Sequence, residues 1–169
     1  MFGKPVEAVI FDMDGLLIDS EAVYIAAMQE AARSLSLEMS LAFCHSMIGI
    51  PRRECNVMIQ GLYGADFDLD CFRSLYSGHV RRLLDERIPV KTGVVELLDL
   101  LDRLGLPRAV ATSAAREAVE HHLGRAGLLE RFHAIATRDD VEHAKPAPDI
   151  YLEAARRLGV TPAHCVALE

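Results

Sequence analysis

Short apolar runs alternate with helix-like segments over most of the chain. The runs 8–11, 108–112, 133–137 and 165–168 are rich in β-branched residues or alanine, and each is short enough for a buried parallel strand. Segments with helical spacing of apolar residues lie at 92–105, 116–127 and 147–159. Strands that alternate with helices predict an α/β fold, a Rossmann-like doubly wound parallel sheet with right-handed crossovers.

Residues 19–88 break this alternation, because they contain helical patterns and no convincing strand. The patterns cover 20–35, 51–62 and 69–87. A connection of this length exceeds what a crossover needs, and long insertions commonly act as lids or binding elements. The sequence therefore predicts an inserted helical cap at 19–88 and an α/β core built from 1–18 and 89–169.

Composition narrows the setting of this fold. The chain has 169 residues, 51% of them hydrophobic, which suffices for a substantial core. No run reaches the roughly 20 apolar residues of a membrane span, and the N-terminus does not resemble a signal peptide, so we expect a cytoplasmic protein without a membrane partner. The net charge of −7 argues against nucleic acid as a partner. Oligomeric state does not follow from the sequence.

The stretch VIFDMDGLLIDSE (9–21) places Asp12 directly after an apolar strand and Asp14 two residues later. In an open parallel sheet this is the edge where ligands bind, and residues i and i+2 point the same way. Two adjacent carboxylates repel each other unless a cation intervenes, and their hard oxygens suit Mg²⁺. Gly15 permits a turn there. The alternative is a strand-to-helix turn whose aspartates cap the helix beginning near Ser20.

Four motifs, in order, resemble those of the haloacid dehalogenase superfamily, in the branch that contains phosphatases and β-phosphoglucomutase. FDMDGLLIDSE resembles the first motif and AVATS (109–113) the second, a strand ending in Thr or Ser. KPAPDIY (145–151) resembles the third motif, and CVALE (165–169) resembles the start of the fourth. The resemblance spans the chain and implies the same core with its helical cap.

The resemblance also implies a catalytic centre. Asp12 would be the nucleophile that forms an aspartyl-phosphate, and Asp14 the general acid and base. Asp12, Asp14 and Glu169 would be ligands of a Mg²⁺ cofactor. In the family an Asp follows immediately after the position of Glu169, so we expect an incomplete part of a longer protein that binds magnesium poorly. Asp139 and Asp140 follow a different strand and are expected to flank Lys145.

Further residues would bind the phosphoryl group. The resemblance implies hydrogen bonds from Thr112 and Ser113, a fixed positive charge from Lys145, and a phosphate-binding turn at Gly15. Taken alone, a Thr-Ser pair at a strand end is more often a turn or a helix cap. Taken alone, Lys145 is also compatible with a solvated surface lysine, although no other lysine follows Lys91.

The expected activity is that of a phosphatase acting on a small phosphorylated metabolite such as a sugar phosphate. The alternative is a β-phosphoglucomutase-like phosphotransferase, but Tyr24 stands where that enzyme has a cap histidine. In the cap, GIPRRE (49–54) resembles a substrate-closing loop, which would make Gly49 and Arg52 substrate contacts; Arg52 is equally compatible with a surface charge. A receiver-like signalling module and a catalytically impaired binding protein are the remaining readings.

Overall fold

The computed structural model describes residues 5–169 and confirms the predicted α/β fold. Its strands are β1 (Ala8–Phe11), β2 (Arg108–Thr112), β3 (Ala134–Thr137) and β4 (Cys165–Leu168). The helices that accompany the sheet are α5 (Val94–Leu104), α6 (Arg116–Arg125) and α7 (Asp149–Leu158). Three single turns of 3₁₀ helix complete this part, namely η1 (Leu129–Arg131), η2 (Arg138–Asp140) and η3 (Pro162–His164).

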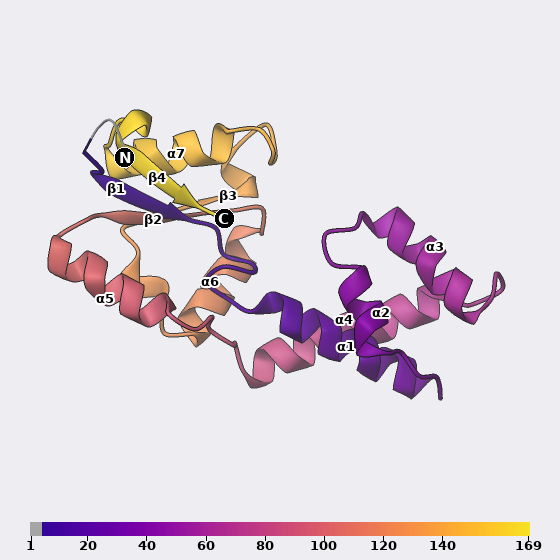
Figure 1. Ribbon diagram of the computed structural model, residues 1–169. Coiled ribbons are helices and arrows are strands. Elements are labelled where there is room, and N and C mark those ends of the chain that lie inside the picture. Colours follow the sequence, from indigo (N-terminus) through magenta and orange to yellow (C-terminus); the bar gives the residue numbers. More distant parts are fainter. Residues whose placement is uncertain (1–4) are drawn as a thin grey trace. The chain divides into compact units, whose positions relative to one another are not determined.

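All neighbouring strands of the sheet are parallel, in the order β3-β2-β1-β4 (Figure 1). The last strand, β4, lies beside the first, with Phe11 in register with Leu168. The expectation that every strand is buried is wrong for β4, whose side chains are half-buried or exposed. Because the strands run the same way, the residues after each one gather at a single edge.

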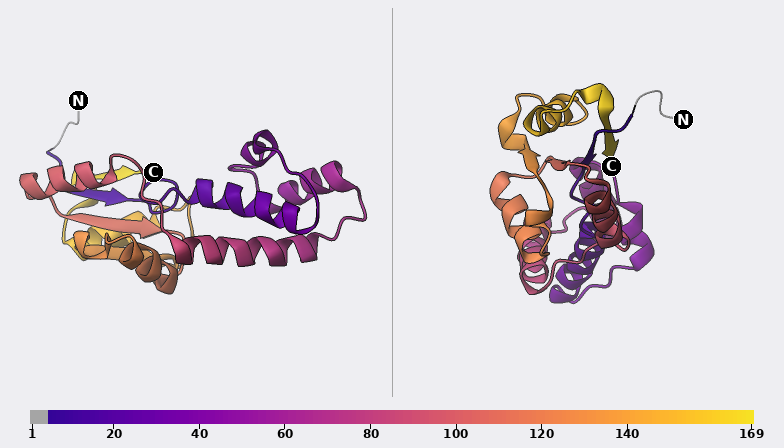
Figure 2. Two further views of the ribbon diagram at one scale, coloured as in Figure 1. Left: turned by 90° about the horizontal axis from the view of Figure 1, so that it is seen from below. Right: turned by 90° about the vertical axis from the view of Figure 1, so that its left-hand side faces the viewer.

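Helices cover both faces of this sheet (Figures 1 and 2). α7 packs against β1, β2 and β3, whereas α5 and α6 lie on the opposite face. The apolar cluster under α7 consists of Ile10, Ala109, Ala111, Ala136, Ile150, Ala154 and Ala155. Alanines on both the strands and the helix allow the two backbones to approach closely, so α7 is held in a fixed position against the sheet.

The chain divides into two compact units, Met1–Asp19 with Arg87–Glu169, and Ser20–Glu86. These bounds lie one or two residues from those expected from sequence. Within the first unit, the segment that leads into the insertion is hydrogen-bonded to the segment that returns from it. The Asp19 amide donates to the Pro89 carbonyl at 2.8 Å, and the Lys91 amide donates to the Leu17 carbonyl at 3.0 Å. The Lys91 ammonium also lies 3.3 Å from the Asp19 carboxylate. Both ends of the insertion are therefore tied together beside β1.

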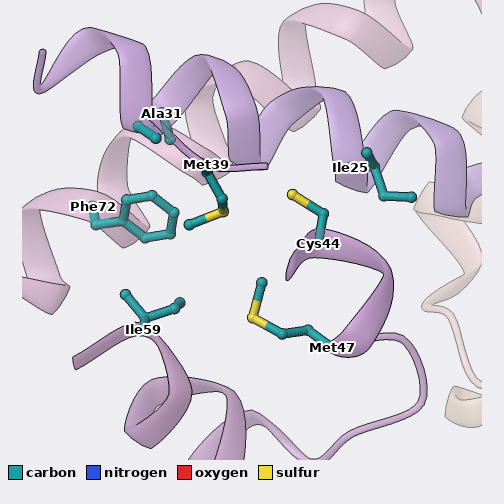
Figure 3. Close-up of a cluster of buried hydrophobic side chains, with 8 residues drawn as sticks. Ile25, Ala31, Met39, Cys44, Met47, Ile59 and Phe72 are labelled. Carbon is teal, nitrogen blue, oxygen red and sulfur yellow. The ribbon is translucent and has the colours of Figure 1, made fainter. Parts of the chain in front are cut away.

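The helical unit contains α1 (Ser20–Ser34), α2 (Leu41–Ser46), α3 (Arg52–Tyr63) and α4 (Leu69–Glu86), with α1 packed on α4. Its buried core is made of Ile25, Ala31, Ala32, Met39, Cys44, Met47, Ile59 and Phe72 (Figure 3). Sequence spacing missed α2, which is too short to show helical periodicity; the Ser40 hydroxyl caps it by accepting from the Phe43 amide at 3.2 Å. Within residues 5–169 no helix has the length and apolar character needed to cross a membrane.

Candidate active site

Asp12 and Glu169 are neighbours because β1 and β4 end side by side. The Asp12 amide donates to the Leu168 carbonyl at 2.9 Å, which continues the ladder one residue beyond β1. The Asp12 side chain is 15% exposed, and that of Glu169 is 62% exposed. Asp12 therefore presents a largely sheltered carboxylate at the ligand-binding edge of the sheet.

Lys145 joins these two carboxylates. Its Nζ lies 2.8 Å from Asp12 Oδ1 and 3.1 Å from Glu169 Oε1. Tyr151, near the start of α7, donates its hydroxyl to Glu169 Oε2, and Lys145 Nζ lies 4.9 Å from the centroid of the Tyr151 ring. Attraction between an ammonium group and an aromatic ring operates at this distance. Lys145 is thus held by two carboxylates and one ring.

Both charges in this cluster are favoured by their surroundings. Burial by itself would lower the pKa of Lys145, but hydrogen bonds with Asp12, Tyr151 and Glu169 outweigh it and raise that pKa. The hydrogen bond from Tyr151, aided by Lys145, lowers the pKa of Glu169 despite some desolvation. The surroundings therefore favour the charged forms of both Lys145 and Glu169.

Asp14 lies in a tight turn that follows Asp12. Met13 is 1% exposed, whereas Asp12 and Asp14 on either side of it are half-buried, which is the alternation of an extended segment. Gly15 has a φ of 79°, which a side chain would disfavour, and its amide donates to the Ile18 carbonyl at 2.8 Å. The Ile18 amide in turn donates to the Met13 carbonyl at 3.0 Å. The turn follows from the sequence DMDG.

Thr112 and Ser113 end β2, the neighbour of β1, but their side chains differ. Thr112 is 1% exposed and its hydroxyl oxygen accepts from the Ala114 amide at 3.1 Å, which closes a local turn. Ser113 is exposed at the same edge. Of the pair, Ser113 has the side chain that is accessible to a ligand, and Thr112 holds the backbone around it.

Gly49 and Arg52 belong to the helical unit. Gly49 has a φ of 73° and Arg52 is the first residue of α3; both are exposed. Across residues 5–169 the Arg52 guanidinium has no ion pair or hydrogen bond, so it is accessible to an anion. Their role as substrate contacts stays a prediction.

The carboxylates provide oxygen ligands of the kind magnesium prefers. Within the described part of the chain no group of three or more His, Cys, Asp or Glu side chains is arranged to hold a metal ion. Magnesium, however, is commonly bound by one or two carboxylates together with substrate phosphate and water. Asp12 and Asp14 are half-buried and two residues apart, and their carboxylate oxygens fit the chemistry of that donor set, whereas Glu169 is engaged with Lys145 and Tyr151.

Two features of the site were not found from sequence. Tyr151 was quoted only as part of a motif, although a tyrosine six residues after Lys145 has a hydroxyl that needs a partner when half-buried. Asp139 and Asp140, expected to flank Lys145, have partners elsewhere: Asp139 accepts from the Arg116 amide, and Asp140 binds the Arg116 and Arg157 guanidinium groups.

The chain is similar in sequence to known hydrolases. A family model described as haloacid dehalogenase-like hydrolase matches residues 9–169. A phosphorylated carbohydrates phosphatase from Thermotoga maritima is 32% identical over 165 residues, which cover 97% of this chain and 76% of the relative. The fructose-1-phosphate phosphatase YqaB of Escherichia coli is 32% identical over 166 residues, covering 95% of this chain and 85% of the relative.

Solved structures share the fold. A hydrolase of the same superfamily from Deinococcus radiodurans, with bound phosphate and sodium, superimposes with a TM-score of 0.82 at 27% sequence identity. The match covers 96% of this chain and 72% of that chain.

Proposed function

The chain belongs to the haloacid dehalogenase-like hydrolases, and on that basis we propose that it hydrolyses the phosphate monoester of a small metabolite through a phosphorylated Asp12. The observation that carries the proposal is the Lys145 ammonium at 2.8 Å from Asp12 Oδ1, at the ligand-binding edge of the sheet. The positive charge of a lysine beside a carboxylate nucleophile offsets the repulsion between that carboxylate and the incoming phosphate.

In the first half-reaction a carboxylate oxygen of Asp12 forms a bond to phosphorus while the bond from phosphorus to the ester oxygen breaks. Asp14 gives its proton to the leaving oxygen, so the alcohol departs neutral. In the second half-reaction Asp14 takes a proton from water, and the water oxygen displaces the Asp12 carboxylate as inorganic phosphate is released. General acid and base assistance of this kind is typically worth about 100- to 10,000-fold.

The phosphoryl oxygens need donors, and the residues around Asp12 supply them. Lys145 contributes its ammonium group, and Ser113 its hydroxyl together with backbone amides of the loop after β2. Thr112 is buried and stabilises that loop, because its hydroxyl oxygen accepts a hydrogen bond from the Ala114 amide. The turn at Gly15 adds backbone near the site.

We propose magnesium as the cofactor, held by Asp12 and Asp14 with Glu169 beside them. When bound, the ion would neutralise charge on the phosphoryl oxygens and on the carboxylates. This assignment rests on the oxygen chemistry of the donors and on the family.

A sugar phosphate or a similar metabolite is the substrate class that we propose. The two relatives compared above are named as phosphatases of phosphorylated carbohydrates and of fructose 1-phosphate. In the helical unit Gly49 and Arg52 are the proposed substrate contacts, because Arg52 is an exposed arginine without a partner in residues 5–169. A phosphomutase is less well supported, since Tyr24 of α1 lacks the chemistry of a histidine.

A generic aryl phosphate tests the proposal. We expect release of the phenol with magnesium, loss of turnover in excess chelator, recovery on adding magnesium back, and inhibition by calcium, whose looser coordination disturbs an octahedral site. Full activity in excess chelator would reject the metal, and the absence of any phosphate release with magnesium present would reject the phosphatase.

A further inference from the structure

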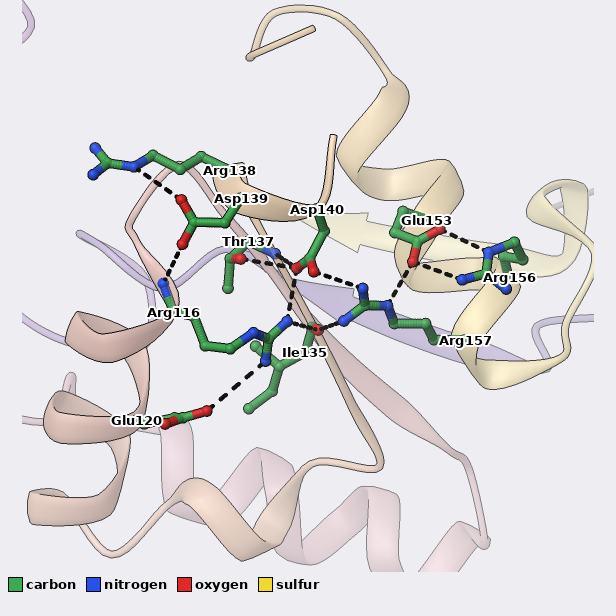
Figure 4. Close-up of polar contacts among 10 residues, drawn as sticks. All are labelled: Arg116, Glu120, Ile135, Thr137, Arg138, Asp139, Asp140, Glu153, Arg156 and Arg157. Atoms are coloured by element: carbon green, nitrogen blue, oxygen red, sulfur yellow. Dashed lines mark hydrogen bonds and ion pairs between the residues drawn. The ribbon is translucent and has the colours of Figure 1, made fainter. Parts of the chain in front are cut away.

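The loop after β3 contains two aspartates that the proposed reaction does not use. Thr112 of β2 is paired with Thr137 of β3, so the loops that leave these strands start side by side. The first of them holds Ser113, and the second forms η2 with Asp139 and Asp140. The two loops and their charged partners are shown in Figure 4.

Asp139 caps a helix to which it does not belong. The residue before α6 is Ala115, whose methyl group cannot accept a hydrogen bond from the first helical amides. Asp139 Oδ2 instead accepts from the Arg116 amide at 2.9 Å (Figure 4). Beside it, the Arg138 amide donates to the Ala114 carbonyl at 3.3 Å. Residues on both sides of Ala115 are thereby attached to the neighbouring loop.

Asp140 fixes the loop that carries Asp139. Its Oδ2 accepts from the Thr137 amide at 2.7 Å, from the Thr137 hydroxyl at 2.8 Å and from Arg116 Nη2 at 2.7 Å. Its other oxygen lies 2.8 Å from Arg157 of α7. Burial opposes the charged carboxylate, but the hydrogen bonds from Thr137 and Arg157 outweigh it and lower the pKa of Asp140. The loop is therefore anchored by Thr137 at the end of β3 and by two arginines, Arg116 on α6 and Arg157 on α7.

The structure assigns Asp139 a positioning role: from the loop after β3 it fixes the backbone of residues 113–116 and so sets the geometry with which Ser113 and its neighbouring amides bind a phosphoryl group. This inference rests on the proposed function of the Ser113 loop. Asp139 acts through that loop and touches no reacting atom. A preorganised amide is effective only when it is already in place, and a displacement of about 1 Å can cost about 100-fold in rate.

The decisive variants are Asp139→Ala and Asp139→Asn. Alanine removes the acceptor, whereas the asparagine side-chain oxygen can still accept from the Arg116 amide. We expect Asp139→Ala to weaken the binding of inorganic phosphate, measured by calorimetry with magnesium present, by about tenfold, and to raise KM for an aryl phosphate by a similar factor. Asp139→Asn should restore most of both.

Glu120→Ala is the matched control. It also removes a carboxylate next to Arg116, at 3.9 Å, but from an exposed position on α6, one turn after Arg116. We expect its phosphate affinity and KM to equal those of the wild type. If Glu120→Ala and Asp139→Ala both lowered the phosphate affinity, the cause would be the loss of a negative charge beside Arg116. That result would overturn the positioning role.

Amide hydrogen exchange, measured together with phosphate affinity, distinguishes a positioning role of Asp139 from a contribution to the stability of α6 alone. In Asp139→Ala the Arg116 amide should lose protection and the phosphate affinity should fall together, and both should recover in Asp139→Asn. A lower Tm with unchanged phosphate affinity would make Asp139 a structural cap only and overturn the inference. Failure of the proposed function would look different, because the wild type itself would then release no phosphate from the aryl ester. The binding of inorganic phosphate and the hydrogen exchange of the Arg116 amide would still decide the role of Asp139.

Discussion

The α/β unit places its functional side chains by strand register, whereas the helical unit places its side chains by the packing of apolar volume. In the first, Asp12 and Lys145 come from distant parts of the sequence and meet at 2.8 Å at the end of β1. In the second, the interior is a cluster around Cys44 and Phe72, and Arg52 lies exposed at the start of α3. The α/β unit thus contains the candidate catalytic charges, and the helical unit presents an exposed arginine on an apolar core.

This difference has a physical cause. A parallel ladder fixes which residues are neighbours, and a shift by one residue would turn every side chain to the other face. Helices packed through Met, Ile and Phe side chains tolerate repacking, provided that the total volume is kept. We therefore expect phosphoryl transfer at the sheet edge and choice of substrate in the helical unit.

Removal of the nucleophile should have the largest effect and should be confined to the α/β unit. Asp12→Asn replaces a carboxylate by a poorly nucleophilic amide, and we expect kcat to fall at least about 1,000-fold. The amide oxygen can still accept from Lys145, so the Tm should change little. Asp66→Asn, the same chemical change at an exposed position of the helical unit, is the control and should keep full activity. Substantial turnover by Asp12→Asn would remove Asp12 from its role.

A cavity in the helical unit should affect stability and spare the chemistry. Phe72 is 3% exposed, and Phe72→Ala is expected to lower the free energy of unfolding by about 3–5 kcal/mol in denaturant titrations. Val57→Ala on α3, where the side chain is 66% exposed, should change it by less than about 0.5 kcal/mol. The folded fraction of Phe72→Ala should bind inorganic phosphate as the wild type does. Weaker binding there would contradict the division of labour.

A substrate contact from the helical unit should depend on substrate size. Arg52→Ala is expected to lower kcat/KM about tenfold for a sugar phosphate and much less for a small aryl phosphate, because only the larger substrate offers further groups to bind. Arg53→Ala, its exposed neighbour on α3, serves as the control. Equal losses on both substrates, or none, would assign Arg52 to the solvated surface.

The two units should respond to opposite ends of the pH scale. Hydrogen bonds from Arg156 and Arg157 lower the pKa of Glu153 on α7 to about 2, so its stabilisation is present above the unfolded pKa and is lost as pH falls toward 2. Burial, aided by Tyr24, raises the pKa of Tyr76 on α4 to about 12, so its stabilisation is present below the unfolded pKa and is lost as pH rises toward 12.

Thermal unfolding across pH measures both effects. Glu153→Gln should flatten the acid side of the stability profile by about 1 kcal/mol, and Tyr76→Phe should flatten the alkaline side by a similar amount. Each variant should leave the other side unchanged. An acid limb that Glu153→Gln does not alter would show that its arginine contacts contribute nothing measurable.

Much of the α/β unit could be predicted from sequence, because its signals are local. The apolar runs 8–11 and 108–112 predicted β1 and β2 to the residue. The motif resemblance placed Asp12 and Lys145 in one expected site, but it did not predict the direct contact between them. The contacts that could not be predicted depend on how elements distant in sequence pack against each other. Tyr151 reaches Glu169 only because α7 lies close on the alanines of the sheet, and Asp139 caps α6 only because two loops leave adjacent strands.

The most direct test of the account is to trap the phosphorylated enzyme. In Asp14→Asn the second half-reaction lacks its base, whereas the first proceeds with p-nitrophenyl phosphate, whose leaving group needs no proton. After an acid quench, mass spectrometry of peptides should find a single phosphoryl group on Asp12, and the double variant Asp12→Asn with Asp14→Asn should carry none. A phosphoryl group on another residue such as Ser113, or none while p-nitrophenol is released, would contradict covalent catalysis by Asp12.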